Sequence, residues 1–161
     1  NELSACIVYQ IGALKGFLEA EGMTLNHVKV HGALYGVAAR DEAVANAIAD
    51  ATEPFGVPLY GMANTLHEQV WTSRGLEFVA EYFTDLDYGD DGSLIITREH
   101  VGCDPERSAE RAVRAVTEGK ATTVSGSDIP MRAESVCVHS DTPGAVEIAA
   151  AVHAALKPYL D

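Results

Sequence analysis

The sequence has few cysteines and no long apolar run. Its three cysteines, Cys6, Cys103 and Cys137, are too few and too scattered for a disulfide framework or a CxxC zinc site, and their odd number is typical of a reducing compartment. No segment approaches the roughly 18 consecutive apolar residues that a membrane span needs. The first residues also lack the basic-then-apolar profile of a signal peptide. We therefore expect a cytoplasmic protein with no membrane partner.

Basic side chains are scarce as well. Eleven lysines and arginines stand against 24 acidic residues, which gives a formal net charge of -13. Such a charge repels polyanions at long range, so nucleic acid is not an expected partner. The chain has 161 residues, of which 47% are hydrophobic, enough for a core. Without a Pro/Ser-rich linker or an internal repeat, residues 1–161 are expected to form a single domain.

Helical and strand-like segments alternate along the chain. Apolar spacing and capping residues predict helices over 2–21, 41–51, 65–74, 105–118 and 144–156. Short apolar runs predict strands over 27–31, 58–63, 77–83 and 135–139, with a further short run at 94–96. This order is typical of an α/β fold with parallel strands and right-handed crossovers. The four to six candidate strands are fewer than the eight of a typical (β/α) barrel.

Polar residues follow several of these predicted strands. In parallel α/β folds the ligand lies beyond the carboxyl ends of the strands, so residues at those ends are the candidates for a site. They are Lys29 and His31 after the first strand, Asn64 after the second, Glu81 within the third, which leads to Asp85, and His139, Ser140 and Asp141 after the last. A single histidine after a strand is more often structural than catalytic, but the coincidence across four strands favours a site.

The segment 137–146 carries the sharpest signal. A strand that leads into a helix through Asp141, Thr142, Pro143 and Gly144 places Asp141 or Thr142 at the N-cap and Pro143 in the first turn. Free backbone N–H groups at such a helix start can bind an anion. The simpler alternative is that Asp141 and Thr142 only cap the helix.

Lys29 and His31 form the second candidate group. Strand alternation places both on one face, with Val30 on the other. A lysine that points into a cleft needs a carboxylate or a phosphate as partner. Lys29 therefore either binds an anionic ligand or forms a buried salt bridge with Glu81 or Asp85.

The sequence contains four distinctive motifs, YQIGAL at 9–14, HVKVHGALY at 27–35, DGSL at 91–94 and CVHSDTPGAV at 137–146. Together they resemble the LamB/YcsF family. The resemblance implies part of a seven-stranded (β/α) barrel of the glycoside hydrolase/deacetylase type. The chain departs from the usual family pattern at Val30, Gly36, Leu86 and Ser140, and the family's N-terminal motifs do not occur in it.

The resemblance also implies an activity, cofactors and partners. The implied activity is the opening of the lactam 5-oxoproline to glutamate, driven by ATP with Mg. The implied partners are two sister subunits that resemble carboxyltransferase or allophanate-hydrolase halves. Because a barrel without its front strands exposes sheet edge and core, we also expect a homo-oligomer or a complementing N-terminal fragment. The functional positions of the family correspond to Lys29, His31, His139 and Asp141 in this sequence.

The resulting hypothesis gives each candidate residue a role. His139, Asp141 and His31 are the expected catalytic residues, with His139 transferring protons and Asp141 orienting it or binding phosphate. The expected substrate or phosphate ligands are Lys29, Thr142, Gly144, Asn64 and Glu81. One alternative is a deacetylase-like hydrolase in which His31, His139 and Asp141 bind a divalent metal. Another is a non-catalytic family member that acts as a binding partner.

Overall fold

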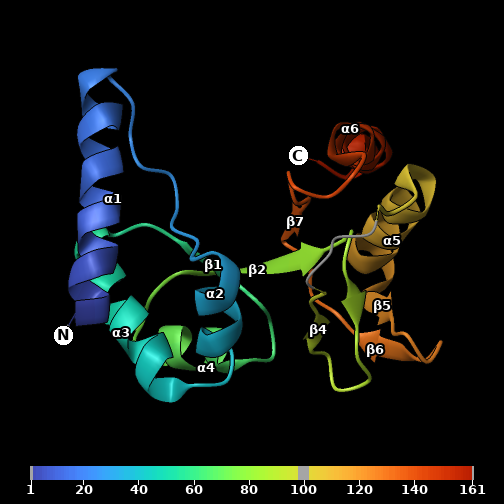
Figure 1. Cartoon of the computed structure of the whole chain (residues 1–161), viewed down its shortest axis with the longest axis horizontal. Coiled ribbons are helices and arrows are strands. Elements are labelled where there is room, and N and C mark those ends of the chain that lie inside the picture. The colour runs from blue at the N-terminus through green and yellow to red at the C-terminus, as the bar shows by residue number, and fades with distance from the viewer. Residues whose placement is uncertain (1, 98–101, 161) are drawn as a thin grey trace. The chain divides into compact units, whose positions relative to one another are not determined.

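The computed structural model describes residues 2–97 and 102–160 and divides into two compact units. The first unit is Asn1–Ala80 and the second is Glu81–Asp161. Strand β2 (Phe78–Phe83) contributes its first half to one unit and its second half to the other (Figure 1). The expectation of a single barrel-type domain over residues 1–161 stays a prediction.

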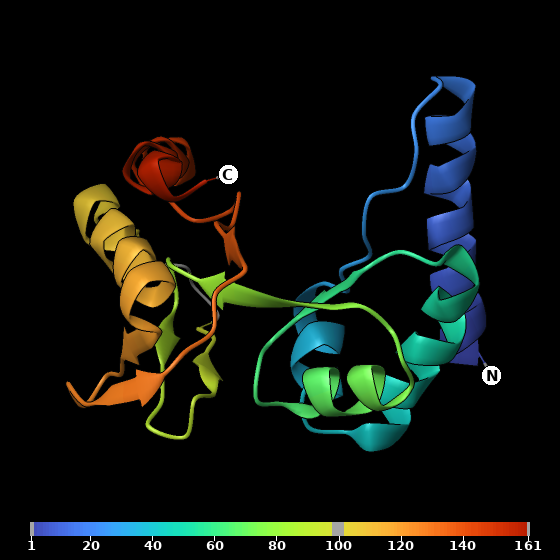
Figure 2. The same ribbon diagram turned by 180° about the vertical axis from the view of Figure 1, so that it is seen from behind.

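The first unit is mainly helical. Helix α3 contacts α1, α2 and α4, and β1 pairs in parallel with Phe78–Ala80 of β2 (Figures 1 and 2). Its elements are α1 (Glu2–Ala20), α2 (Gly32–Ala38), α3 (Glu42–Thr52), the 3-10 turn η1 (Glu53–Phe55), β1 (Leu59–Gly61) and α4 (Leu66–Ser73). The predicted helices over 2–21, 41–51 and 65–74 are therefore confirmed within one or two residues.

Local signals explain where these helices begin and end. The Asp41 side chain accepts a hydrogen bond from the N–H of Val44 at 3.1 Å and so caps α3. The Thr65 hydroxyl does the same for α4, accepting from the N–H of His67. Gly22 and Gly75 follow α1 and α4 with positive φ, the left-handed conformation that glycine adopts most readily.

The core of the first unit is built on Trp71, which is completely buried. Its indole N–H donates to the carbonyl of Ala45 at 3.0 Å, and its ring stacks on His67 with centroids 4.6 Å apart. His67 is also completely buried, with Nδ1 accepting from the N–H of Met62 and Nε2 donating to the carbonyl of Tyr35. Because both ring nitrogens have backbone partners, this neutral tautomer is fully satisfied.

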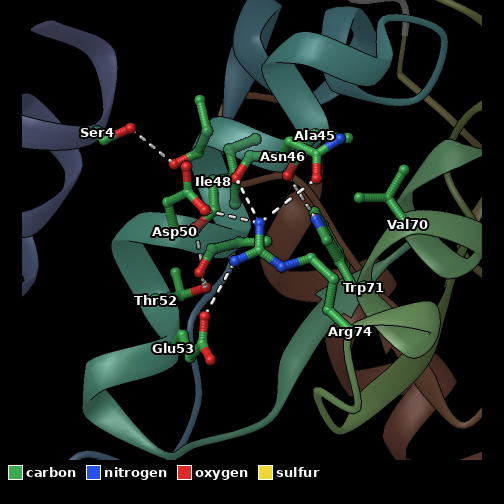
Figure 3. A network of polar contacts seen from close by, with 12 residues as sticks. Ser4, Ala45, Asn46, Ile48, Asp50, Thr52, Glu53, Val70, Trp71 and Arg74 are labelled. Atoms are coloured by element: carbon green, nitrogen blue, oxygen red, sulfur yellow. Dashed lines mark hydrogen bonds and ion pairs between the residues drawn. The ribbon is translucent and has the colours of Figure 1, made fainter. Parts of the chain in front are cut away.

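Arg74, directly after α4, joins α4 to α3 (Figure 3). Its guanidinium forms ion pairs with Asp50 at 2.7 Å and Glu53 at 2.9 Å, and donates to the carbonyl of Asn46 at 3.3 Å. The hydrogen bond to Asp50 is the main cause that raises the pKa of Arg74. Ser4 of α1 donates to the carbonyl of Ala47 on the same helix α3. These contacts hold α1, α3 and α4 in one arrangement.

The second unit consists of a parallel strand pair, two hairpins and two helices. Strand β7 pairs in parallel with Glu81–Phe83 of β2, and helices α5 and α6 pack against each other (Figure 1). Its elements are β3 (Asp87–Tyr88), β4 (Leu94–Ile95), α5 (Pro105–Glu118), β5 (Lys120–Thr122), β6 (Asp128–Pro130), β7 (Ser135–Cys137), α6 (Ala145–Leu156) and the 3-10 turn η2 (Lys157–Tyr159). Ala109, Ala112, Ile148, Val152 and Leu156 form its core.

The α/β class with parallel strands is confirmed, with β1, β2 and β7 hydrogen-bonded in that order. Two details of the sequence prediction are wrong. The strand expected over 27–31 is a single bridge from Val28 to Leu59, because the chain turns into α2 at Gly32. The structure also contains two antiparallel hairpins, β3–β4 and β5–β6, that the sequence does not predict. Among the described residues, no helix is long and apolar enough to cross a membrane.

Gly61 tests the packing around Trp71. A Cβ at this position would lie 2.7 Å from Cζ3 of Trp71 and 2.9 Å from Nδ1 of His67. We expect Gly61→Ala to lower the free energy of unfolding by about 1–3 kcal/mol, as overpacking does. Gly12→Ala is the matched control, because nothing lies within 4 Å of a Cβ there, and it should raise stability by about 0.5–1 kcal/mol. Urea unfolding that gave equal changes for both variants would contradict this packing.

Buried His67 makes stability depend on pH. Burial lowers its pKa from 6.5 to about 4, although the hydrogen bond to Tyr35 acts in the opposite direction. The unfolded chain therefore binds more protons, so this contribution is complete above about pH 6.5 and is lost as the pH falls toward 4. We expect a loss of about 3 kcal/mol over that range, measured by urea unfolding. His67→Gln should flatten the pH dependence, and an unchanged slope would contradict the assignment.

Candidate functional site

The residues of the candidate site in the second unit lie just beyond the carboxyl ends of β2 and β7. Phe83 and Cys137 are partners in the parallel register, and they end their strands. Asp85 lies two residues beyond Phe83, and His139 lies two residues beyond Cys137. The parallel pairing therefore carries a carboxylate and an imidazole to the same edge of the strand pair, as expected for sites in α/β folds.

Asp85 and His139 form a tight hydrogen-bonded pair. Nδ1 of His139 lies 3.0 Å from Oδ1 and 3.2 Å from Oδ2 of Asp85, and the backbone N–H of His139 donates to Oδ2 at 2.7 Å. The hydroxyl of Thr142 donates to the same Oδ2 at 3.3 Å. The ring of Phe83 stacks on the imidazole with centroids 5.5 Å apart.

Burial differs sharply across this pair. The Asp85 side chain is completely buried, whereas 28% of the His139 side chain is exposed. Burial raises the pKa of Asp85, but the hydrogen bonds from the side chain and backbone of His139 outweigh it and hold that pKa below its usual value. Asp85 is therefore an ionised acceptor at neutral pH, and His139 links it to the surface.

The N-cap of α6 is Gly144, and not Asp141 or Thr142 as the sequence predicts. Helix α6 begins at Ala145, its N-cap is Gly144 with φ of 81°, and no side chain caps it. Neither Asp141 nor Thr142 is the cap, because the helix starts later than predicted, and the buried Thr142 hydroxyl is used by Asp85 instead. Pro143 accordingly precedes the helix.

The start of α6 bears on the phosphate of ATP with Mg, which the family resemblance implies. No side chain caps the helix at Gly144, and the N–H of Ala145 donates to the carbonyl of Thr142 at 3.0 Å, so the first-turn N–H groups left for an anion are those of Val146 and Glu147. Glu147 lies in that turn and places a carboxylate at the same end. A carboxylate disfavours a bare phosphate, but Mg is commonly held between a carboxylate and substrate phosphates.

Glu81 lies within β2 and is buried, with its backbone opposite Ser135 in the register. It therefore belongs to the interior of the second unit, near the start of β7. The predicted roles of Glu81 and Asp141 as ligand contacts stay predictions.

Lys29, His31 and Asn64 lie in the first unit. Lys29 is half-buried, with Nζ 5.8 Å from the ring centroid of Tyr35, and exposed His31 is the N-cap residue of α2. Asn64 follows β1 with φ of 61°, and its N–H donates to Glu68 at 2.9 Å. Lys29 and His31 do not end a strand, since only Val28 forms a bridge. Their convergence with His139 on one site stays a prediction.

Two further findings bear on ligands. Within residues 2–97 and 102–160, no three His, Cys, Asp or Glu side chains are grouped so that they could hold a metal ion. A cleft of about 580 Å³ in the second unit runs between α5 and the β5–β6 hairpin, and none of the predicted site residues lines it. The predicted site residues therefore lie outside this cleft.

The sequence predicts His139 and Thr142 as site residues but gives Asp85 no role in the site, although the structure bonds both of them to it. The signal that could have found it is the strand register, which brings residues two positions beyond Phe83 and Cys137 together. That register depends on which strands are neighbours, so the sequence alone marks Asp85 only as a polar residue after a strand.

Comparison with known proteins places the chain in a family. It is 45% identical to the A component of 5-oxoprolinase from Thermus thermophilus over 98% of its own length and 64% of the relative's, and 46% identical to the same component from Mycobacterium marinum over 94% and 62%. It is 40% identical to the lactam utilization protein lamB of Emericella nidulans over 92% and 60%.

A solved structure agrees with these sequence matches. The crystal structure of a lactam utilization protein from Thermus thermophilus matches with a TM-score of 0.88 and 41% identity, covering 98% of this chain and 64% of that one. The chain thus spans a little under two thirds of the length of these relatives. The LamB/YcsF family model matches residues 1–159. The chain belongs to the LamB/YcsF family.

Proposed function

We propose that this chain takes part in the ATP-dependent opening of 5-oxoproline to glutamate, in the role of the A component of 5-oxoprolinase. The relatives that bear this name support the substrate and the reaction. Within the chain, the observation that carries the proposal is the partly exposed imidazole of His139, held by the buried carboxylate of Asp85. Such a pair can move a proton to or from a bound substrate.

The reaction needs an activated carbonyl and a proton donor. An unactivated lactam is a poor electrophile, and ATP bound with Mg would supply the activation by transferring its terminal phosphoryl group to the carbonyl oxygen and leaving as ADP. Water would then add to the carbonyl carbon, the ring C–N bond would break, and the nitrogen would leave with a proton. A second water would release the phosphoryl group as inorganic phosphate. His139 takes a proton from the water and returns one to the leaving nitrogen, the two roles of an acid–base histidine.

The remaining predicted residues fill the binding roles. The ammonium of Lys29 pairs with an anionic group of the substrate, and the N–H groups of Val146 and Glu147 hold phosphate oxygens. His31, Asn64, Glu81 and Asp141 are proposed contacts of the same ligands, and Thr142 acts through Asp85.

The proposal extends to architecture and partners. Strands β1, β2 and β7 are part of a seven-stranded (β/α) barrel, and two carboxyltransferase-like sister subunits complete the enzyme in the cytoplasm. A homo-oligomer or a complementing N-terminal fragment is also part of the proposal. Exposed apolar side chains on α1 support such a partner, since Tyr9 is 75% and Phe17 74% exposed.

His139→Ala tests the reaction. In the complete assembly with its sister subunits and ATP, we expect glutamate release from 5-oxoproline to fall by a factor on the order of 10² to 10⁴, the usual contribution of acid–base catalysis. His153→Ala is the matched control, because His153 is an exposed histidine on α6, and it should leave turnover unchanged. Full turnover by His139→Ala, or turnover by the unchanged protein without ATP, would contradict the proposal.

A further inference from the structure

We propose that Asp85 is the positioning residue of this site, which holds the His139 imidazole in the tautomer protonated at Nδ1 and leaves Nε2 as the atom that exchanges the proton. The reference to a proton exchanged with substrate rests on the proposed function. The tautomer itself follows from the contacts within the second unit and is tested without any substrate.

The hydrogen bonds that Asp85 accepts show which ring nitrogen of His139 carries the proton. The backbone N–H of His139 and the hydroxyl of Thr142 both donate to Oδ2, and Nδ1 of His139 lies 3.0 Å from Oδ1. An ionised carboxylate only accepts hydrogen bonds. The proton between Oδ1 and the imidazole therefore belongs to Nδ1, and the lone pair of the neutral ring is on Nε2.

Packing fixes the orientation of the ring. Phe83 stacks on it with an interplanar angle of 18°, and the backbone N–H of the same His139 is bound to Asp85. Main chain and ring of one residue thus share one carboxylate. Because Asp85 comes from the end of β2 and His139 from the end of β7, the register of two parallel strands sets the geometry. A group held in this way loses little entropy on reaching its reactive orientation.

Asp85→Asn distinguishes positioning from simple structural support. Asparagine keeps one acceptor oxygen. With that oxygen in the position of Oδ2, it still accepts the hydrogen bond from the backbone N–H of His139, which is 2.7 Å long with Asp85. Its amide NH₂ then faces Nδ1 and donates to it. The ring proton moves to Nε2, so the variant holds the imidazole in place in the wrong tautomer for accepting a proton there.

The first measurement is ¹⁵N NMR of the full chain labelled at histidine, with the His139 signals assigned by their loss in His139→Gln. At a pH where the ring is neutral, we expect a protonated-type shift at Nδ1 and an unprotonated-type shift at Nε2. Asp85→Asn should exchange the two. Asp90→Asn is the control, because it removes an exposed carboxylate of the same unit that accepts from Thr123 and Ser125, and it should leave the His139 shifts unchanged.

The second measurement is turnover in the complete assembly. Asp85→Asn should lower kcat by a factor on the order of 10² to 10⁴ with little change in KM, because Nε2 can no longer accept a proton. A loss of folding alone would instead remove the native signals of all histidines. Asp85→Ala, which leaves no acceptor opposite Nδ1, should give a mixture of both tautomers and an intermediate shift pattern.

The outcomes separate this inference from the proposed function. An Nε2-protonated His139 in the unchanged protein, or no exchange of shifts in a folded Asp85→Asn, overturns the role of Asp85 whatever the activity. The expected shifts together with no opening of 5-oxoproline by the complete assembly would uphold the positioning and overturn the proposed function. Expected shifts with an unchanged kcat for Asp85→Asn would uphold the tautomer and overturn the exchange of the proton at Nε2.

Discussion

The arrangement of the second unit depends on one buried charge. The carboxylate of Asp85 is removed from water, and an isolated buried carboxylate is strongly unfavourable unless hydrogen bonds replace its hydration. The replacements come from one short segment, as the backbone and ring of His139 and the hydroxyl of Thr142. Satisfying that charge therefore fixes the path of the chain between β7 and α6, and with it the start of α6 at Ala145.

Two histidines show how burial decides the role of a residue type. His67 is completely buried and both its nitrogens bind backbone groups, so it stays neutral and holds Tyr35, Met62 and Trp71 together. His139 has one nitrogen on a buried carboxylate and a side chain that reaches the surface. The first is a part of the core. The second is partly exposed, and its carboxylate partner follows a different strand, β2.

The sequence predicts what short-range signals determine. Asp41 and Asp104 cap their helices, and Gly75 and Gly119 end theirs with positive φ, because caps and left-handed glycines act within a few residues. Pairings between distant residues were not predictable in this way. The reduction of segment 27–31 to one bridge, from Val28 to Leu59, depends on such a distant partner. The same holds for the site, where His139 stood out but its contact with Asp85, 54 residues away, required the strand register.

The central claim is that the reacting group binds at the carboxyl ends of β2 and β7, against the His139 imidazole. The most direct measurement is a crystal structure of the complete assembly with 5-oxoproline bound. The account predicts that the lactam lies within hydrogen-bond distance of Nε2 of His139 while Nδ1 remains on Asp85. A lactam bound elsewhere, with no substrate atom near His139, would contradict it.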